Sequence, residues 1–477
     1  MGSLRSVSAL MSLVCVALAC APSTGTGAAL PASAGGAGSG SSPGAGALGL
    51  GDPVFPLDGN GGYDARHYLL KLSYVPSTKQ MNAVATIEAK AEQGLTRFNF
   101  DFAGLKISKI TVNGQSAAFS RKGAELTVVP KKALAKGETF TTAITYSGRP
   151  APLKDAANLG TYGFIPTADG AFVTSEPNGS KSWFPANDHP SDKALFDFVV
   201  TVPAGTTVLA NGEMTGKPVT AGGKTTFVWS EKHPMATYLA TVTMGKFQLK
   251  QGKTPGGIPN LAAVDPKYKT ALDDLYSTSG EVTDYWSTVF GPYPFSSTGG
   301  VIDDYSAGYA LENQTKPMYG GFTPDSSIIA HELAHQWFGD SLTITRWKDL
   351  WLNEGFASYA EWLWSEHKGR GTAESLFKSA YARATGDAIW AYPPGVAQKK
   401  DLFNESVYTR GGMTLHALRQ RIGDKTFFAL LKQWTSSNKY GYVNTKQFIA
   451  LAEKMSGKDL GPLFDAWLFQ PKKPTEW

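Results

Sequence analysis

The sequence predicts a two-domain protein in which an all-β domain precedes a mainly helical domain. From residue 54 to residue 250 the chain consists of short alternating or β-rich runs separated by turn residues. From residue 251 to residue 477 it carries longer segments whose apolar residues recur with helical spacing. The length of 477 residues also exceeds what one hydrophobic core usually organises. We therefore expect two domains in this order.

The first 53 residues are predicted to lie outside the folded body. Residues 1–19 have the features of a signal peptide, because Arg5 supplies a positive charge and the apolar run after it is too short for a stable membrane span. Residues 20–53 are rich in Gly, Ser, Ala and Pro, a composition typical of a flexible linker. We therefore expect the protein to be exported.

Cys20 leaves two alternatives for the fate of the exported protein. It comes after a small-residue cleavage pattern, Ala17 to Ala19, that also resembles a bacterial lipoprotein box. The protein is then either a cell-surface lipoprotein tethered through a lipidated Cys20 or a cleaved, secreted or periplasmic protein. Cys15 and Cys20 are the two cysteines of the chain, so the folded body cannot contain an internal disulfide.

The composition indicates a globular protein and names no charged partner. Hydrophobic residues make up 42% of the chain and charged residues 18%, which is typical of a folded protein. The formal net charge of +5 arises from 45 basic and 40 acidic residues that are spread along the chain. The blocks of like charge that mark a nucleic-acid-binding arm are missing from the sequence, so we expect no nucleic-acid partner.

The elements expected in each domain follow from the spacing of apolar residues. The expected strands are 67–75, 82–92, 140–148, 196–205 and 237–247. The expected helices are 271–290, 326–339, 350–367, 417–423, 425–437 and 445–457. No repeat with a period of 20 to 50 residues is present in the sequence, which argues against a solenoid or a propeller.

The segment TPDSSIIAHELAHQWFGD is predicted to form one helix that carries two metal ligands. Thr323 can cap the helix, Pro324 suits its first position, and Gly339 ends the run. His331 and His335 lie four residues apart, so their imidazoles project from the same face of the helix. Two such side chains can bind one metal ion.

Glu354, in the next predicted helix, supplies a third candidate ligand 19 residues after His335. Two histidines and one glutamate leave the fourth position of Zn²⁺ open, which is the arrangement of a catalytic zinc site. We therefore expect one Zn²⁺ per chain. Glu332 lies beside the first ligand and is expected to accept a proton from a metal-activated water that attacks a carbonyl group. Two packed or solvated histidines are the alternative, which the downstream N-E-G-F-A sequence disfavours.

These motifs resemble those of the gluzincin zinc aminopeptidases, the family typified by aminopeptidase N and leukotriene A4 hydrolase. The chain reads H-E-L-A-H-Q-W-F-G-D and then N-E-G-F-A, and the resemblance extends from about Val54 to about Pro471. It implies a short, bacterial-like, two-domain member. Its fold would be a saddle-like β domain followed by a thermolysin-like, mostly helical zinc-peptidase domain. Longer members have further C-terminal domains whose substrate contacts would here be absent or replaced.

The resemblance also implies where the substrate's amino end binds. The family's exopeptidase motif, usually G-A-M-E-N, reads Y-A-L-E-N here, and Glu312 falls on the position that binds the free α-amino group. Ala310 belongs to the same substrate-binding segment. Tyr309 and Leu311 replace the family's Gly and Met, which leaves the shape of the adjoining pocket open. Glu176 matches a second position that contacts the amine or the pocket.

Tyr408 completes the implied site. It lies in VYTRGGMTLHALR, which resembles a family segment whose tyrosine hydrogen-bonds the developing oxyanion. Glu312, Glu176 and Tyr408 also have ordinary interpretations, as a surface carboxylate, a loop residue and a core aromatic. Their chemistry nevertheless fits one reaction, because an exopeptidase needs an activated water, an oxyanion donor and an anion that faces a cationic amine.

We therefore predict a zinc metallopeptidase that removes residues from peptides with a free N-terminus. A zinc endopeptidase, an epoxide-opening hydrolase and a catalytically inactive binding protein on the same fold are the alternatives. Glu312 disfavours the endopeptidase. The presence of Glu332 and of all three ligand residues disfavours the inactive protein.

Overall fold

The computed structural model describes residues 43–154 and 159–475. The predicted signal peptide, both cysteines and most of the predicted linker therefore lie outside the described residues. Within the described ranges, no helix combines the length and the apolar character that crossing a membrane requires.

Residues 43–53, which end the predicted linker, are part of the folded body. Strand β1 (Gly44–Ala45) pairs in parallel with β4 (Leu95–Asp101). The side chain of Asp52 is fully buried, and its carboxylate accepts the backbone N–H groups of Val54 and Trp347 at 2.7 and 2.9 Å. This segment is ordered because its backbone pairs with β4 and the Asp52 carboxylate accepts backbone hydrogen bonds. The Gly and Pro content of the segment does not predict these interactions.

The N-terminal domain is built of strands, as the sequence predicts, and its described residues form three sheets. The largest has nine strands: β15 (Glu213–Met214), β17 (Lys224–Ala236), β13 (Lys193–Pro203), β2 (Tyr63–Val75), β3 (Gln80–Ala91), β9 (Thr139–Gly148), β5 (Lys106–Val112) and β6 (Gln115–Ser116) in spatial order, with β16 (Val219–Ala221) beside β17. A second sheet contains β1, β4, β8 (Glu125–Val129) and β7 (Ala118–Lys122). The third contains β10 (Leu153–Lys154), β11 (Thr161–Pro166), β12 (Ala171–Thr174), β18 (Val242–Gly245) and β14 (Thr207–Ala210).

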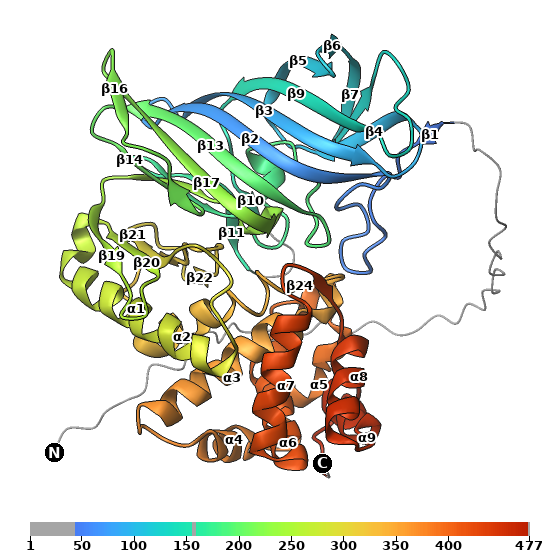
Figure 1. Ribbon diagram of the computed structural model, residues 1–477, viewed down its shortest axis with the longest axis vertical. Coiled ribbons are helices and arrows are strands. Elements are labelled where there is room, and N and C mark those ends of the chain that lie inside the picture. Colours follow the sequence, from blue (N-terminus) through green and yellow to red (C-terminus); the bar gives the residue numbers. More distant parts are fainter. Residues whose placement is uncertain (1–42, 155–158, 476–477) are drawn as a thin grey trace, which may run out of the picture. The chain divides into compact units, whose positions relative to one another are not determined.

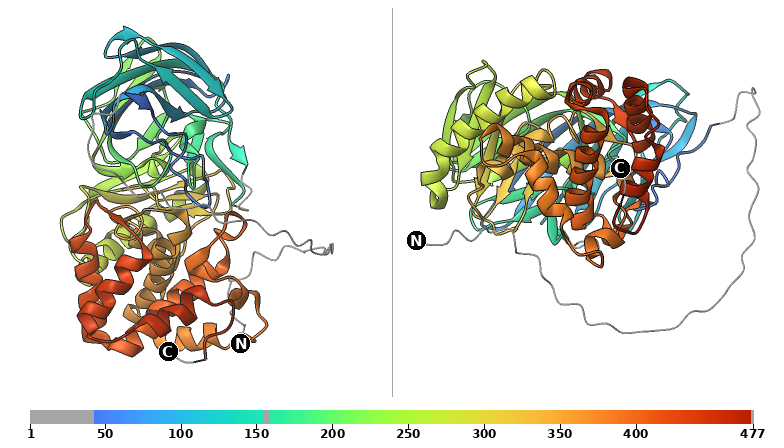
Figure 2. Two further views of the ribbon diagram at one scale, coloured as in Figure 1. Left: turned by 90° about the vertical axis from the view of Figure 1, so that its right-hand side faces the viewer. Right: turned by 90° about the horizontal axis from the view of Figure 1, so that it is seen from below.

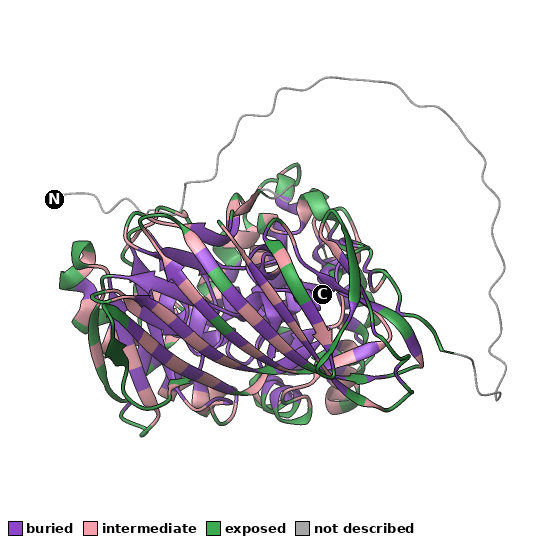
Figure 3. Cartoon of the chain, turned by 90° about the horizontal axis from the view of Figure 1, so that it is seen from above, coloured by how far each residue is buried: buried purple, intermediate pink, exposed green. Residues whose placement is uncertain are grey.

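Alternation of side chains explains why these segments form strands. Buried residues alternate with more exposed ones along β2, β3 and β13, a pattern that Figure 3 shows as stripes across the large sheet. The buried faces carry aromatic rings, and Tyr68 stacks on Phe196 with ring centroids 4.8 Å apart. The all-β prediction for this part of the chain is thus confirmed.

The C-terminal domain is mainly helical and begins with one mixed sheet. That sheet contains β19 (Gln248–Lys253), β20 (Pro259–Val264), β21 (Thr298–Asp303), β23 (Met318–Gly320) and β22 (Ala310–Leu311) in spatial order. The predicted boundary between residues 250 and 251 falls inside β19, so the sheet starts slightly earlier than the helical texture does. A further pair joins β24 (Thr343–Ile344) to β25 (Tyr442–Val443).

Six helices of the described part of this domain correspond to predicted ones, although Gly411–Ile422 begins six residues before the prediction, and Ala373–Tyr381, Ala388–Ala391 and Gly461–Phe464 are not predicted by the sequence. They are α1 (Leu272–Val289), α2 (Ser326–Ala334), α3 (Trp351–His367), α4 (Ala373–Tyr381), α5 (Ala388–Ala391), α6 (Gly411–Ile422), α7 (Asp424–Ser437), α8 (Thr445–Ser456) and α9 (Gly461–Phe464). Helix α2 differs from the prediction at both ends, because Asp325 and not Thr323 is the N-cap and because the helix ends at Ala334, with His335 as its C-cap, and not at Gly339. The Asp325 carboxylate accepts the N–H groups of Ser327 and Ile328, which satisfies two of the free donors at a helix start.

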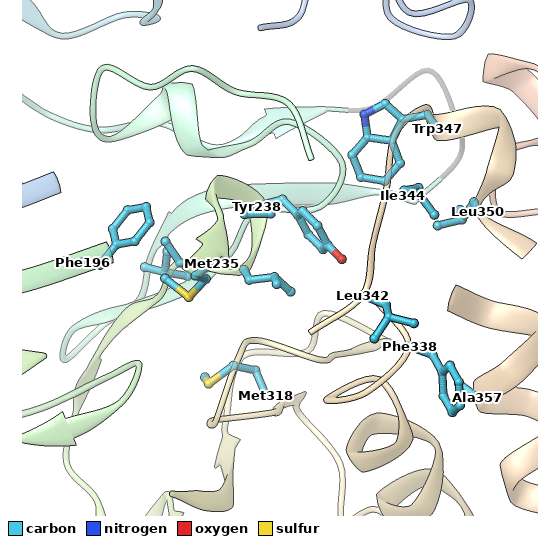
Figure 4. Packing of buried hydrophobic residues seen from close by; sticks show 14 of the residues in the cluster. Phe196, Met235, Tyr238, Met318, Phe338, Leu342, Ile344, Trp347, Leu350 and Ala357 are labelled. Carbon is cyan, nitrogen blue, oxygen red and sulfur yellow. The ribbon is translucent and has the colours of Figure 1, made fainter. Parts of the chain in front are cut away.

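The two domains share one continuous hydrophobic core and adjoin each other in Figures 1 and 2. Figure 4 shows this junction, where Met235 and Tyr238 of the β domain lie opposite Leu342 and Trp347 of the C-terminal domain. A polar contact also crosses it, because the buried ammonium of Lys193 donates to the carbonyl oxygens of Asp340 and Ser341 at 2.7 and 2.8 Å. The junction is therefore fixed by both packing and hydrogen bonds.

Arg410 closes the C-terminal end of the described chain onto the helices. Its fully buried guanidinium donates to the carbonyl oxygens of Trp390, Ala466, Trp467, Gln470 and Lys472. Arg410 ends a single π-helical turn, Ser406–Arg410, that leads directly into α6. The segment around residue 470 is thus attached to the turn that carries Tyr408.

Candidate zinc centre

The three predicted metal ligands come together at the junction of α2 and α3. Nε2 of His331 lies 3.3 Å from Oε2 of Glu354, and Nε2 of His335 lies 3.4 Å from the same oxygen. A tetrahedral zinc ion with ligand distances of about 2.0–2.1 Å separates its ligands by about 3.3 Å. The spacing of these donor atoms therefore fits one zinc ion without rearrangement.

The other ring nitrogen of each histidine already has a partner. Nδ1 of His331 lies 2.7 Å from Oε1 of Glu361, and Nδ1 of His335 lies 3.0 Å from the backbone oxygen of Phe338. Both partners are acceptors, so each Nδ1 carries the proton and each Nε2 presents its lone pair to the metal. Glu361 lies two turns beyond Glu354 on α3. No sequence motif points to Glu361, although the seven-residue spacing from Glu354 places both carboxylates on the same helix face.

Neighbouring elements hold the ligand helices in place. Nε1 of Trp286 on α1 donates to the backbone oxygen of Ala330 on α2 at 3.1 Å. The Phe338 ring stacks on Phe356 of α3, with centroids 4.5 Å apart. These contacts set α2 against α1 and set the segment that follows α2 against α3.

A second group of carboxylates adjoins the ligands. Oxygens of Glu176, Glu312 and Glu354 all lie within 4.8 Å of one another, and the three side chains are buried. Burial raises the pKa of Glu176 well above its ordinary value, and the charge of Glu312 raises it further. Glu354 is different, because the two histidines outweigh the effect of burial and hold its pKa at about 2. Three acids this close together form a site for cationic groups.

Glu332 and Tyr408 also face this cluster. Glu332 is buried on α2, and burial raises its pKa to about 7 although His331 and His335 lower it. The Tyr408 ring lies nearly parallel to the His331 ring, with centroids 6.3 Å apart. The structure thus brings Glu332, the predicted proton acceptor, and the ring of Tyr408, the predicted oxyanion donor, to the ligand set.

The unusual Y-A-L-E-N segment is accommodated at the edge of the C-terminal sheet. Ala310 lies on β22, the last strand of that sheet, and is half-buried. The Tyr309 hydroxyl lies 2.8 Å from Oγ1 of Thr174 and donates to the backbone oxygen of Thr161, also at 2.8 Å. This side chain therefore reaches the β domain, so the Gly-to-Tyr change adds a contact between the domains.

Two glycines allow the elements that carry Glu354 and Tyr408 to meet. A Cβ atom on Gly411 would lie 2.8 Å from Cα of Gly355, and one on Gly355 would lie 2.9 Å from Cα of Gly411. Both distances are shorter than any normal contact. The start of α6 and the first turns of α3 thus approach each other only because both side chains are hydrogen atoms.

Comparison with known families assigns the chain. The profile of the peptidase family M1 domain matches residues 323–467, and that of the peptidase M1 N-terminal domain matches residues 64–239. Together they cover more than half of the chain. The chain belongs to peptidase family M1.

This M1 peptidase is similar to longer proteins named aminopeptidase N. It is 28% identical over 449 residues to aminopeptidase N of Lactococcus lactis subsp. lactis (strain IL1403), in an alignment that covers 86% of this chain and 51% of that protein. This chain therefore spans about half the length of that relative.

Solved M1 structures match nearly the whole described fold. The crystal structure of an M1 zinc metallopeptidase from Deinococcus radiodurans is 28% identical, with a TM-score of 0.80, over 90% of this chain and 99% of that chain. A mutant of the Deinococcus radiodurans enzyme bound to a Tyr-Ser-Ala substrate has a TM-score of 0.81 at 27% identity, over 90% of this chain and 100% of that one. The predicted two-domain gluzincin fold and its zinc cofactor are thus confirmed.

Proposed function

We propose that this M1 peptidase is a zinc aminopeptidase that hydrolyses the first peptide bond of peptides with a free N-terminus. The observation that carries the proposal is that Glu176 and Glu312 lie within 4.8 Å of one another and of Glu354, which is one of the proposed zinc ligands. Buried carboxyl groups next to a zinc ligand suit a cationic α-amine, which would fix the adjoining peptide bond over the reacting centre. An endopeptidase has no need of such a site.

The residues divide the chemistry among them. Zinc, when bound by His331, His335 and Glu354, supplies a Lewis acid that polarises the carbonyl and lowers the pKa of water. Glu332 takes a proton from the attacking water and passes it to the nitrogen that leaves as the peptide bond breaks. Tyr408 donates a hydrogen bond to the carbonyl oxygen as it gains negative charge.

Three further observations support the proposal. The relative with 28% identity is named aminopeptidase N, and a related two-domain metallopeptidase mutant was solved with L-arginine bound. A free amino acid is the product that an aminopeptidase releases. Ala310 on the edge strand β22 also offers backbone groups to which an extended peptide can add as a further strand.

The test compares a free peptide with its N-acetylated form. At neutral pH a free α-amine, whose pKa is about 8, is largely cationic, and acetylation removes that charge. We expect the zinc-loaded protein to release the first residue of the free peptide and to cleave the blocked peptide poorly. Glu312→Ala should weaken cleavage of the free peptide and hardly affect the blocked one. Glu281→Ala on the surface of α1 is the control and should change neither.

Equal cleavage of both peptides at internal bonds would instead identify a zinc endopeptidase. No cleavage of any peptide by zinc-loaded protein would favour an inactive binding protein.

We further propose that the chain is exported, a prediction that rests on residues 1–20 of the sequence. Cell fractionation of the expressed full-length chain tests this proposal, and protein that stays uncleaved in the cytoplasm would overturn it. Incorporation of labelled fatty acid, abolished by Cys20→Ser, would identify a lipoprotein. Release of unlabelled protein would identify a secreted one.

A further inference from the structure

A tyrosine of the β domain contacts the amine-binding carboxylate. Tyr238 lies in the short 3₁₀ turn Thr237–Leu239, and its hydroxyl donates to Oε1 of Glu312 at 3.3 Å. The ring is 1% exposed. Among the described residues, Tyr238 is the one whose side chain donates a hydrogen bond to the Glu312 carboxylate.

The position of the Tyr238 ring is fixed by its surroundings. The Trp347 ring packs edge-on against it with centroids 5.6 Å apart, and Figure 4 shows the two rings at the domain junction. The next residue, Leu239, accepts Nδ2 of Asn313 through its backbone oxygen at 2.9 Å. The turn is therefore hydrogen-bonded to two consecutive residues, Glu312 and Asn313. These two bonds fix the position of the Tyr238 phenol relative to the Glu312 carboxylate.

The hydrogen bond between Tyr238 and Glu312 lies in a group of neighbouring carboxyl groups. Glu312 lies within 4.8 Å of Glu176 and Glu354, and like charges at that distance favour either protonation of Glu312 or its movement away. Burial and the neighbouring Glu312 charge raise the pKa of Tyr238 well above its ordinary value, so the phenol keeps its proton and remains a donor. A donor to one carboxylate oxygen stabilises the charged form and leaves the other oxygen for a ligand.

We propose that Tyr238 is a positioning residue that holds the Glu312 carboxylate in the orientation that receives the substrate's α-amine, so that the β domain sets the preference for a free N-terminus. The inference rests on the proposed aminopeptidase function. Tyr238 does not touch the substrate and acts only through Glu312. Its loss is therefore expected to weaken recognition of the amine far more than the chemical step.

The experiment measures binding separately from turnover. Zinc-loaded protein carrying Glu332→Gln, which is expected to be inactive, is titrated by calorimetry with a free tripeptide and with its N-acetylated form. Tyr238→Phe is then added, which removes one hydroxyl at almost constant volume. We expect the dissociation constant of the free peptide to rise on the order of tenfold and that of the blocked peptide to stay unchanged.

Two further variants make the test specific. Tyr146→Phe is the matched control, because the Tyr146 hydroxyl donates to the backbone oxygen of Trp183 in the β-domain core. It should leave both dissociation constants unchanged. In a Glu312→Gln background, Tyr238→Phe should have no further effect on the free peptide, since its partner charge is already gone.

The outcomes separate this inference from the proposed function. If protein with Tyr238 prefers the free peptide and Tyr238→Phe keeps that preference, the positioning role is overturned while the aminopeptidase proposal stands. An equal loss of binding for both peptides also overturns it, because that result indicates general disruption. If protein with Tyr238 shows no preference for the free amine, both proposals fall.

Discussion

The Glu361 carboxylate is hydrogen-bonded to the ring of His331, a proposed zinc ligand. Removing its charge should let the ring turn and should weaken its donation to zinc, because the Nδ1–H group would lose a charged acceptor. We predict that Glu361→Gln lowers zinc affinity by roughly 10- to 100-fold. Competition with a chromogenic chelator measures this, with Glu281→Gln on α1 as a control. Unchanged zinc affinity would show that the ring is held by packing alone.

Glu332 is predicted to be required for turnover and dispensable for the metal. Glu332→Gln keeps the size of the side chain and all three ligands but removes the proton acceptor. We expect stoichiometric zinc by atomic emission together with loss of nearly all hydrolysis. A metal-loaded variant with normal activity would refute the general-base role.

Tyr408→Phe tests the oxyanion donor. The change removes one hydroxyl from a half-buried ring, so the fold should be retained. Loss of one such donor raises the barrier by about 3 kcal/mol, which lowers kcat roughly a hundredfold. Steady-state kinetics should show a much smaller change in KM. If kcat does not fall, the parallel packing of Tyr408 on His331 is structural only.

At this scale the sequence predicts the ligands well and their supports poorly. The spacing of His331, His335 and Glu354 can be recognised from the sequence alone, because all three lie in two consecutive predicted helices. Tyr238 is not legible in this way, because it lies 74 residues before Glu312 and reaches it only through the packing of two domains.

Among the elements, the crossing of α3 and the start of α6 depends on the paired glycines. Gly411→Ala would place a methyl group 2.8 Å from Cα of Gly355, so the two segments must separate. Overpacking of this kind typically costs about 1–3 kcal/mol. We predict a lower melting temperature and, because Glu354 and Tyr408 move apart, a lower kcat.

Gly412→Ala is the matched control for this change. The added methyl group would meet its nearest neighbour, the backbone nitrogen of Tyr359, at 3.5 Å, which is an ordinary contact. Alanine also favours the helix. Equal loss of stability in both variants would show that helix packing here is insensitive to the Gly355 contact.

The elements themselves are predictable to different degrees. Helices such as α1 and α3 are long enough for their apolar spacing to identify them. Strands β22 and β23 contain two and three residues, too few to display any period, so the sheet that carries Ala310 is not expected from the pattern. The start of α2 at Asp325 also departs from the pattern, because Asp325 outcompetes Thr323 for the free N–H groups.

For the whole molecule, stability should depend on pH through buried carboxylates such as Asp303. Burial raises the pKa of Asp303 to about 7, so the folded protein binds this proton more tightly than the unfolded chain, whose Asp titrates near 3.9. The proton therefore stabilises the fold below pH 4, and that contribution is lost as the pH rises from about 4 to about 7.

We predict that Asp303→Asn removes this dependence. The stability of the variant relative to the unmodified protein should grow between pH 4 and pH 7, by at most about 1.4 kcal/mol per pH unit, and then level off. Urea unfolding at several pH values measures the difference. A flat difference for Asp303→Asn would contradict the prediction.

The order of the two domains follows from the sequence, but their junction does not. The spacing of apolar residues changes from a strand pattern to a helical pattern near residue 250, and this change identifies the two domains. The residues that join the two domains are far apart in the sequence. Lys193 and Asp340, whose backbone oxygen accepts a hydrogen bond from the Lys193 ammonium, are separated by 147 residues. No local sequence pattern predicts such a hydrogen bond, because its donor and acceptor meet only after both domains have folded.

The attachment of Arg410 to the chain near residue 470 imposes an order of events on synthesis. The guanidinium cannot complete its bonds until Lys472, 62 residues later, has left the ribosome. Until then the turn that carries Tyr408 lacks its anchor. We therefore expect the growing chain to remain without peptidase activity even after its metal ligands have emerged, so that the enzyme is not yet active beside the other nascent proteins of the cell.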